Sequence, residues 1–334
     1  MINFYQGKKV FIAGGAGLLG QALIRKLVPL GAKITATEFK NRKIDAECRS
    51  QIAVEPFDLR KPDGLIGSRA NVYDGQEIVF WAAAKVGGAR AIRENPSELI
   101  HYNLELTARN IKAAVDAGVE RLGFTSSSYV YPDLPYRAEE DDVWKGDVPL
   151  IHYGLGWIKR YLETLCKHHH MTSKTKFAII RPTAYYGPHD DFDLETCHAL
   201  PALLRKVVEK RFPLEVWGDG SEVRQWTLVE DVAEGLLEVV ANYAVADPVN
   251  ICHAQTNSIA QLVQELLNIE GHYGPFNDEN QFPPRVIYMT DKPTVISRRV
   301  SDPSKAKRLL GFECKTSLTE GLSKTIEWFK ANHQ

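Results

Sequence analysis

The chain has 334 residues, of which 44% are hydrophobic and 25% are charged, a composition typical of a globular protein with a sizeable core. Its 41 basic residues nearly balance 42 acidic ones, which argues against a broad surface for nucleic acid or for an anionic membrane. Five scattered cysteines without a C-x-x-C pair predict reduced thiols in a cytoplasmic protein, not a disulfide framework or a zinc site. The N-terminus lacks the layout of a signal peptide, and the most apolar run, Ile78–Ala84, is too short to span a membrane.

Strand-like runs alternate with helical patterns through the first half of the chain. The strand-like runs are Lys9–Ala13, Lys33–Glu38, Glu77–Trp81, Arg121–Ser126 and Lys176–Pro182. Helical patterns occupy Leu18–Leu30 and Leu104–Ala117, the second of which ends at Gly118. This alternation predicts an α/β fold with a doubly wound parallel sheet covered by helices on both faces.

The connection from the first strand to the first helix is rich in glycine and reads GGAGLLG. Glycine permits a tight turn there, lets backbone N–H groups approach a pyrophosphate, and lets the helix pack closely on the strand. The N-terminus of the helix would direct its positive dipole end at the phosphates. The pattern therefore predicts a Rossmann-type dinucleotide site. Its expected residues are Gly14, Gly17, Leu18, Leu19 and Gly20.

Glu38 ends the second strand, where a carboxylate about 20 residues after the glycines can accept hydrogen bonds from the adenosine ribose. This position favours NAD, because a carboxylate would repel the 2′-phosphate of NADP. Arg42 and Lys43 follow closely, so NADP stays open. Asp58 and Leu59, after a third strand, are interpreted either as a contact on the adenine side or as a simple turn.

The second half of the chain contains more proline, glycine and aromatic residues. Three capping-box signatures open amphipathic helices there, at Thr227-x-x-Glu230, Ser258-x-x-Gln261 and Ser317-x-x-Glu320. We expect residues 183–334 to form a smaller, mixed α/β domain for the substrate. This domain would interleave with the NAD(P) domain of residues 1–182 through returns to the main sheet near 226–254.

Several motifs together resemble the extended short-chain dehydrogenase/reductases that modify nucleotide sugars. These motifs are GGAGLLG, FWAAAKVGGARA, FTSSSYVYP, RPTAYYGPHDDFD, CHALPALLRK and VWGDGSEVRQWTLVEDVAE. Within this family the chain is most similar to the GDP-L-fucose synthases and next to the GDP-mannose 3,5-epimerases, nearly end to end. The resemblance implies an NAD(P)-dependent enzyme for a nucleoside-diphosphate sugar, with GDP as the expected nucleotide. It also implies a homodimer built from two helices per subunit.

The family's usual catalytic groups are a Ser or Thr, a Tyr, and a Lys four residues after the Tyr. Ser127 falls on the serine position. In the stretch HYGLGWIKRYLETLC, Tyr153 and Lys159 are six residues apart, so two registers are open. If Tyr153 is the family tyrosine, Trp157 replaces the lysine; if Lys159 is the family lysine, Leu155 replaces the tyrosine.

The residues downstream favour the second register. Counted from Lys159, Glu163 and Cys166 match the Glu and Cys that these relatives place four and seven positions after their lysine. We therefore interpret Lys159 as the ribose-binding lysine and Leu155 as the replacement for the catalytic tyrosine. Leucine cannot transfer a proton, and Tyr153 could substitute only if the helix starts late enough to leave residue 153 in a loop.

Two other residues are candidates for proton transfer. Tyr129 occupies the position where GDP-L-fucose synthases carry an acid/base cysteine, and a phenol there could donate a proton. The alternative is that Tyr129 only fills the volume left by Leu155. His198 matches the other acid/base of epimerising relatives, and imidazole suits removal of a proton beside a keto group; the alternative is a hydrogen-bonded core histidine.

The resemblance also assigns the remaining contacts. The other expected cofactor contacts are Ala82, Ala83, Lys85 and Asn103. Arg205 and Arg224 match positions that meet the diphosphate or the base, and Trp217 would offer a flat wall; surface salt bridges and core packing are the alternatives. The histidine tract at Lys167–Met171 occupies adjacent helix positions, which do not converge on one ion, so we expect no metal site.

The leading hypothesis is an NAD(P)-dependent nucleotide-sugar epimerase and/or 4-keto reductase whose active site lacks the usual tyrosine. One alternative is a sugar-nucleotide 4-epimerase, oxidase or dehydratase that uses NAD transiently. The other is a catalytically silent family member that binds nucleotide.

Overall fold

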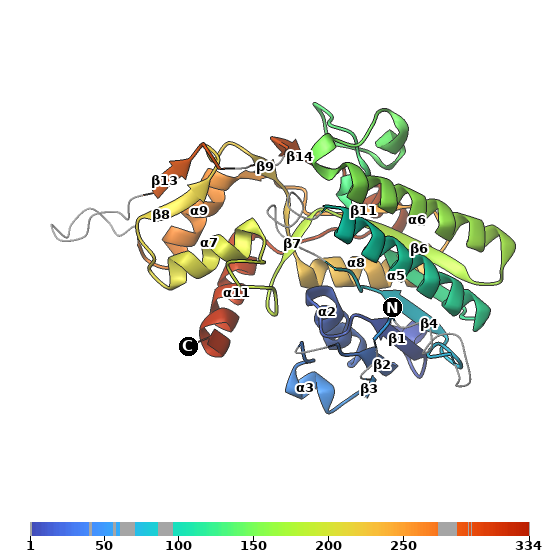
Figure 1. Cartoon of the computed structure of the whole chain (residues 1–334). Coiled ribbons are helices and arrows are strands. Elements are labelled where there is room, and N and C mark those ends of the chain that lie inside the picture. Colours follow the sequence, from blue (N-terminus) through green and yellow to red (C-terminus); the bar gives the residue numbers. More distant parts are fainter. Residues whose placement is uncertain are drawn as a thin grey trace.

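The computed structural model describes residues 2–39, 42–55, 58–60, 71–85, 96–272, 286–292, 294 and 296–333. At its centre lies a seven-stranded parallel sheet in the order β11-β6-β5-β4-β1-β2-β3 (Figure 1). Its strands are β1 (Lys9–Ala13), β2 (Lys33–Thr37), β3 (Ala53–Glu55), β4 (Ile78–Trp81), β5 (Arg121–Thr125), β6 (Lys176–Pro182) and β11 (Val249–Ile251). The doubly wound α/β fold expected from the sequence is confirmed.

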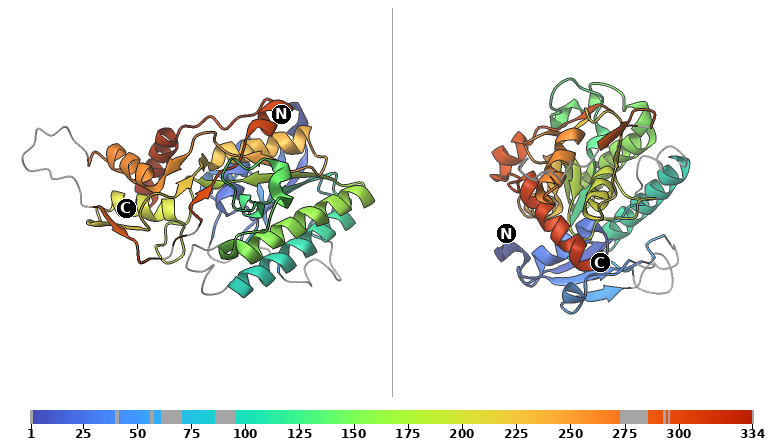
Figure 2. Two further views of the ribbon diagram at one scale, coloured as in Figure 1. Left: turned by 90° about the horizontal axis from the view of Figure 1, so that it is seen from above. Right: turned by 90° about the vertical axis from the view of Figure 1, so that its left-hand side faces the viewer.

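Both faces of this sheet are buried because its strands are continuously apolar. In β1, Val10 and Ile12 point into one core cluster, and Phe11 and Ala13 point into the other. The helices on these faces are α2 (Leu18–Leu27), α5 (Pro96–Asp116), α6 (Tyr153–Thr172) and α8 (Val229–Asn242). Helices α2 and α8 share the first cluster and α5 and α6 share the second, so the sheet lies between two helical layers (Figure 2).

The order of the strands in the sheet determines where the candidate site lies. β1 and β4 are neighbours, yet the chain proceeds from β1 toward one edge of the sheet and from β4 toward the other. At such a switch point the loops after the two strands diverge and leave a crevice at the carboxyl ends of the strands. The glycine turn follows β1, residues 82–85 follow β4, and Ser127 follows β5, so all three lie at this edge.

The helices and strands of the C-terminal half lie at the left in Figure 1. They enclose a core cluster of their own. Its helices are α7 (Ala199–Val208), α9 (Ile259–Ile269) and α11 (Leu318–His333), beside the paired strands β8 (Leu214–Trp217) and β13 (Val286–Met289). The short strands between the two halves are β7 (Ala184–Tyr186), paired with β10 (Trp226–Leu228), and β9 (Val223–Arg224), which lies between β12 (Asn257–Ser258) and β14 (Arg298–Arg299). The remaining helical segments are α1 (Ile2–Tyr5), α3 (Ala46–Arg49), η2 (Ser128–Val130), η3 (Glu140–Trp144), η4 (Leu150–His152) and α10 (Ser304–Leu310).

Two of the three expected helix caps are found. Ser258 and Gln261 form a complete capping box on α9, and the hydroxyl of Ser317 accepts a hydrogen bond from the Glu320 N–H at 3.2 Å. The third expectation was wrong: Thr227 belongs to β10, and its hydroxyl accepts the N–H of His253 at 3.0 Å instead of capping α8. A local S/T-x-x-E pattern therefore does not reveal that a strand runs directly into the helix.

Two helices differ in length from their apolar patterns. α2 stops at Leu27, before the expected Leu30, because residues 28–31 form a turn that ends in Gly31 with φ of +72°. α5 begins at Pro96, well before the expected Leu104. The apolar pattern did not reveal the first turns of this helix, because they carry few apolar residues. No helix in the described part of the chain is both long and apolar enough to cross a membrane.

Candidate functional site

The glycine turn after β1 cannot accept side chains at two of its positions. Gly14 has φ of +85°, and a Cβ there would lie 2.9 Å from the Cα of Ala83. A Cβ on Gly20 would lie 2.1 Å from the carbonyl oxygen of Gly14. Gly17 is the N-cap of α2, so the N–H groups of Leu18 and Leu19 begin the helix without partners in the preceding turn. This close backbone approach and helix N-terminus fit the pyrophosphate of a dinucleotide.

The loop after β4 is held by Asn103 of α5. Its side-chain oxygen accepts the Lys85 N–H at 2.8 Å, and its Nδ2 donates to the Lys85 carbonyl at 2.9 Å. Ala82 continues the sheet through its N–H, which donates to the Ala13 carbonyl at 3.1 Å. Asn103 therefore fixes the wall formed by Ala82, Ala83 and Lys85, which explains a polar residue inside a helix. The AAAKVGG motif continues from residue 86 outside the described residues.

Glu38, the residue expected to receive the ribose, is bonded to neighbouring groups of the protein. Its side chain is only 2% exposed, and it accepts hydrogen bonds from the Ile44 N–H at 2.9 Å, from Lys43 at 3.3 Å and from Arg49. Burial alone would raise the pKa of this carboxyl, but the bonds from Arg49, Ile44 and Lys43 outweigh burial and lower it. The carboxylate thus holds the loop after β2, and its contact with the ribose hydroxyls stays a prediction.

Asp58 and Leu59 behave as a turn. Asp58 accepts the Arg60 N–H at 3.0 Å and the Arg60 guanidinium at 2.7 and 2.6 Å. The Leu59 side chain is buried in the core cluster under α5. These contacts account for both residues without a ligand.

Lys159 of α6 lies at the carboxyl end of β5. Its ammonium donates to the Thr125 carbonyl at 2.9 Å and lies 5.0 Å from the centre of the Phe124 ring. Burial lowers the pKa of Lys159 to about 8, and the nearby Glu163 carboxylate opposes this effect only in part. A lysine at this edge of the sheet can reach the crevice where the nicotinamide ribose would lie.

The two faces of α6 separate the residues of the two registers. Tyr153, Trp157 and Tyr161 form one stripe and are 44%, 39% and 55% exposed. Lys159 and the buried Leu162 lie on the side that packs on the sheet. The helix begins at Tyr153 itself, and the ring of Tyr153 packs edge-on against Trp157. The condition under which Tyr153 could replace the family tyrosine, a late helix start, is therefore not met.

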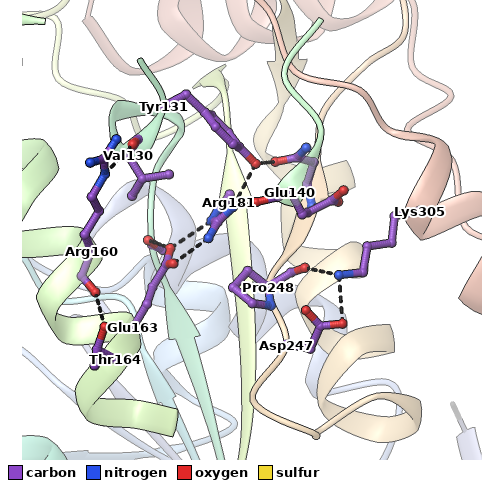
Figure 3. Close-up of polar contacts among 12 residues, drawn as sticks. Val130, Tyr131, Glu140, Arg160, Glu163, Thr164, Arg181, Asp247, Pro248 and Lys305 are labelled. Atoms are coloured by element: carbon purple, nitrogen blue, oxygen red, sulfur yellow. Dashed lines mark hydrogen bonds and ion pairs between the residues drawn. The ribbon is translucent and has the colours of Figure 1, made fainter. Parts of the chain in front are cut away.

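A buried polar network holds α6 in register with the sheet (Figure 3). The Arg181 guanidinium of β6 donates to both oxygens of Glu163, at 2.9 and 2.6 Å, one helical turn after Lys159. Arg181 also donates to the Tyr131 hydroxyl at 3.0 Å and to the Glu140 carbonyl at 2.7 Å. The network therefore fixes Lys159 through the helix that carries it.

Ser127 and Tyr129 follow β5. The hydroxyl of Ser127 accepts the Tyr129 N–H at 3.1 Å and caps the η2 turn. The Tyr129 ring stacks on His152, with centroids 4.1 Å apart and planes at 21°. The guanidinium carbon of Arg299 lies 4.4 Å from the centre of the Tyr129 ring. Tyr129 is thus held by an imidazole and a cation.

His198 is the N-cap of α7 and is exposed, so the alternative of a core histidine does not hold. Desolvation by the walls around the ring, followed by the charge of Arg299, lowers the pKa of His198. Asp190 lies in the same connection between β7 and α7, and burial raises its pKa to about 7. The Asp190 carboxyl could therefore exchange protons near neutral pH.

The residues expected at the nucleotide end are largely engaged within the protein. Arg205 pairs with Glu209 at 2.8 Å, as the surface alternative expects. Arg224 is buried and donates to the carbonyls of Val223 and Ile296 at 2.7 and 2.6 Å; burial, then Arg299, lowers its pKa to about 10. Trp217 is 43% exposed at the end of β8.

Sequence reasoning does not single out His152, Asp190 or Arg299. The repeated acids of GPHDD and the paired arginines of SRRV were the available signals. Their meaning depends on pairings such as Arg299 beside Arg224 on neighbouring strands, which no local pattern reveals. Among the described residues, no three His, Cys, Asp or Glu side chains converge as metal ligands would.

Comparisons with known proteins agree with this fold and identify the family. The model of the NAD dependent epimerase/dehydratase family matches residues 10–252. GDP-L-fucose synthase 1 of Arabidopsis thaliana is 31% identical over 97% of this chain and 94% of its own length. GDP-mannose 3,5-epimerase of the same plant is 27% identical, with coverage of 96% and 82%. The fold matches a GDP-L-fucose synthetase from Naegleria fowleri bound to NADP, with a TM-score of 0.78, 22% identity and coverage of 98% and 94%. The family match covers most of the chain and confirms the expected resemblance, so the chain belongs to the NAD-dependent epimerase/dehydratase family of enzymes.

Proposed function

We propose that the chain epimerises and/or reduces a 4-keto sugar linked to a nucleoside diphosphate, with GDP as the nucleotide. The names of the two plant relatives, a GDP-L-fucose synthase and a GDP-mannose 3,5-epimerase, support GDP. The glycine turn and the Asn103 clamp support a bound dinucleotide. When bound, NAD(P) would supply or accept the hydride.

In this proposal the enzyme binds NAD as its cofactor, and it also accepts NADP. The Glu38 carboxylate, which would repel a 2′-phosphate, is neutralised by Arg49 and Lys43. Both cations are partly exposed, so they could face a phosphate as well as a ribose. The structural relative from Naegleria fowleri was solved with NADP, which agrees with this reading.

The active site in this proposal lacks the usual tyrosine. Lys159 is the ribose-binding lysine and Leu155 stands at the tyrosine position, so no phenol is available one helical turn before the lysine. The outward stripe of Tyr153 and Trp157 supports this register, because a catalytic pair must face the crevice. Ser127 would hold the sugar carbonyl at the end of β5.

In this proposal Tyr129 and His198 transfer the protons to and from the sugar. The observation that carries this assignment is the stack of Tyr129 on His152 beside Arg299, which fixes a phenol near the end of β5. A neutral phenol can donate to a reduced carbonyl or to an enolate, and an imidazole can remove a proton beside the keto group. Inversion needs groups on opposite faces of the sugar ring, and these two residues come from different elements.

The decisive experiment is turnover of GDP-4-keto-6-deoxymannose with reduced cofactor in deuterated water. The Tyr129→Phe variant should lose about 10²- to 10⁴-fold in kcat while it binds the cofactor as the wild type does, because only the transferable proton is removed. Tyr243→Phe is the matched control: its hydroxyl donates to Asp247 at 2.7 Å in the connection that follows α8, so activity should persist. Unchanged turnover in Tyr129→Phe would contradict the assignment.

The same experiment separates the alternatives. Deuterium that enters C3 or C5 excludes a catalytically silent protein, whereas bound cofactor without hydride exchange across a panel of 4-keto sugars favours one. Transient oxidation of a hydroxyl needs a base on that hydroxyl, and Leu155 cannot serve. A 4-epimerase, oxidase or dehydratase is therefore the weaker candidate.

The assembly in this proposal is a homodimer in the cytoplasm. Helices α5 and α6 lie side by side on one face of the sheet (Figure 2). Tyr153, Trp157 and Tyr161 of α6 form an exposed stripe. Exposed aromatic residues at this spacing suit helix packing between two subunits. The five cysteines are free thiols in the structure, which agrees with a reducing compartment.

A further inference from the structure

Four cations lie around the end of β2, beside Glu38 and Phe39. These cations are Arg42, Lys43, Arg49 and Arg60. They contact Glu38 or Phe39 through ion pairs, a backbone bridge or a cation–π contact. In a Rossmann fold an arginine near the carboxylate at this position accommodates the 2′-phosphate of NADP. The binding of NADP therefore depends on which of these cations is available to a phosphate.

Three of the cations are held by carboxylates of the loops after β2 and β3. Glu38 pairs with Lys43 at 3.3 Å and also with Arg49. Asp58 accepts two hydrogen bonds from the Arg60 guanidinium, at 2.7 and 2.6 Å. A bidentate pair of this kind is stronger than a single contact. A phosphate would have to break such bonds to take Arg60.

Arg42 is paired with a carboxylate that comes from a distant part of the chain. Its Nη2 lies 3.4 Å from Oδ2 of Asp191, in the connection between β7 and α7. The Arg42 side chain is 53% exposed, and exposed pairs with one contact are weak. Arg42 is therefore the cation that a phosphate could take most readily, and Asp191 is the group that competes for it.

The connection that carries Asp191 is held in place without Arg42. Asp191 accepts a hydrogen bond from the Thr196 hydroxyl at 2.7 Å. His189 has φ of +70°, which is unfavourable for a residue with a Cβ, and its ring packs on Trp328 of α11 with centroids 4.6 Å apart. Its Nε2 also lies 3.6 Å from Asp45, in the loop after β2. These contacts keep the carboxylate of Asp191 beside the end of β2.

We propose that Asp191 sets the cofactor preference of the enzyme in favour of NAD, because it occupies Arg42 and repels a 2′-phosphate. NAD leaves the pair of Arg42 and Asp191 intact, whereas NADP must separate it. The inference rests on the proposed function for the place of the dinucleotide, with its adenosine at the end of β2. It adds a specificity-determining residue that lies far along the chain from the glycine turn and from Glu38.

Calorimetric titration with NAD and with NADP tests this role through the ratio of the two dissociation constants. Asp191→Asn keeps an acceptor for Thr196 but removes the charge. It should tighten NADP about fivefold and change NAD less than about twofold. Asp193→Asn is the matched control from the same connection: its carboxylate accepts the Glu195 N–H at 3.0 Å, and the ratio should stay at the wild-type value.

The double variant shows whether the effect passes through Arg42. Arg42→Gln should weaken NADP about tenfold, because it removes the charged donor for the phosphate. In that background Asp191→Asn should shift the ratio by about twofold or less, since only its repulsion of the phosphate is lost. An unchanged ratio in Asp191→Asn, or an equal shift with and without Arg42, would overturn the role of Asp191.

The same titrations separate this role from the proposed function. If the ratio shifts as expected but no GDP-sugar is turned over, Asp191 keeps its role and the proposed sugar chemistry fails. If GDP-sugars are turned over but the ratio does not change in Asp191→Asn, the proposed function stands and the role of Asp191 is wrong. A chain that binds neither dinucleotide would contradict both.

Discussion

Lys159 lies at the candidate site, and the burial of its charge lowers the stability of the folded protein. Its ammonium is enclosed at the end of β5, where the Thr125 carbonyl is its hydrogen-bond acceptor at 2.9 Å. Burial lowers its pKa from the usual 10.5 to about 8. A buried charge of this kind is retained where a function requires it, and in the proposed function Lys159 meets the nicotinamide ribose.

The pH dependence of stability tests the burial of Lys159. Between about pH 8 and pH 10.5 the unfolded chain binds more protons than the folded one, so this residue makes stability rise with pH, and its cost is full below pH 8. The cofactor-free Lys159→Met variant should therefore exceed the wild type at pH 7 by up to about 3 kcal/mol. Its advantage should shrink toward pH 10 in urea unfolding; an advantage that grows with pH would contradict the buried ammonium.

At the scale of single elements, two features prepare the crevice: the glycine turn before α2 and the polar network that anchors α6. The turn depends on backbone atoms that approach more closely than a Cβ allows. The network depends on the bidentate pair of Glu163 and Arg181, both nearly fully buried. The glycine turn is encoded by neighbouring residues in the sequence. The pair of Glu163 and Arg181 instead joins helix α6 to strand β6 through the core.

Gly20→Ala should abolish NAD(P) binding, because its Cβ would lie 2.1 Å from the Gly14 carbonyl and the turn must open. Gly118→Ala is the matched control. It has φ of +74° and no atom within 4 Å of a Cβ, so it should cost about 1 kcal/mol of stability and leave binding intact. Fluorescence titration with NADPH and thermal unfolding measure the two effects; normal binding in Gly20→Ala would exclude the close packing of the turn.

Arg181→Met should destabilise the protein by about 3–5 kcal/mol, since it leaves the Glu163 carboxylate buried without its partner. The double variant with Glu163→Leu should recover part of this loss, because no charge remains unpaired. Lys324→Ala breaks an exposed pair with Glu320 at 2.7 Å on α11 and should cost less than about 0.5 kcal/mol. Equal losses from the buried and the exposed pair, measured by urea unfolding, would show that the network does not anchor α6.

At the scale of the whole molecule, one helix serves two surfaces. α6 turns Lys159 toward the crevice and the stripe of Tyr153, Trp157 and Tyr161 outward. A second subunit packed on this stripe would hold α6, and with it Lys159, more firmly against the sheet. The proposed dimer would therefore support the active site without adding a residue to it.

Trp157→Glu should convert the dimer to a monomer, with a dissociation constant raised about 30-fold or more, because a charge would enter an apolar interface. Leu309→Glu is the control: Leu309 is 42% exposed on α10, away from α5 and α6, and its variant should stay dimeric. Light scattering coupled to gel filtration gives the mass of each. A wild type that is monomeric at micromolar concentration would rule out this assembly.

The sequence by itself determined the elements that depend on local patterns. The strand-like runs, the glycine turn and the Ser258 capping box were predicted correctly, because periodicity and turn chemistry lie within a few residues. The division at residues 182 and 183 stays a prediction, although β11 returns to the main sheet as expected.

Only the tertiary structure decided how the polar residues are used. Glu38 pairs with Arg49, and Tyr129 stacks on His152. Arg299 contacts both of these rings from strand β14, far along the chain from either one. A polar side chain has no fixed partner in the sequence. Its partner is set by which backbones the packed core brings together, and that core is formed by the whole chain at once.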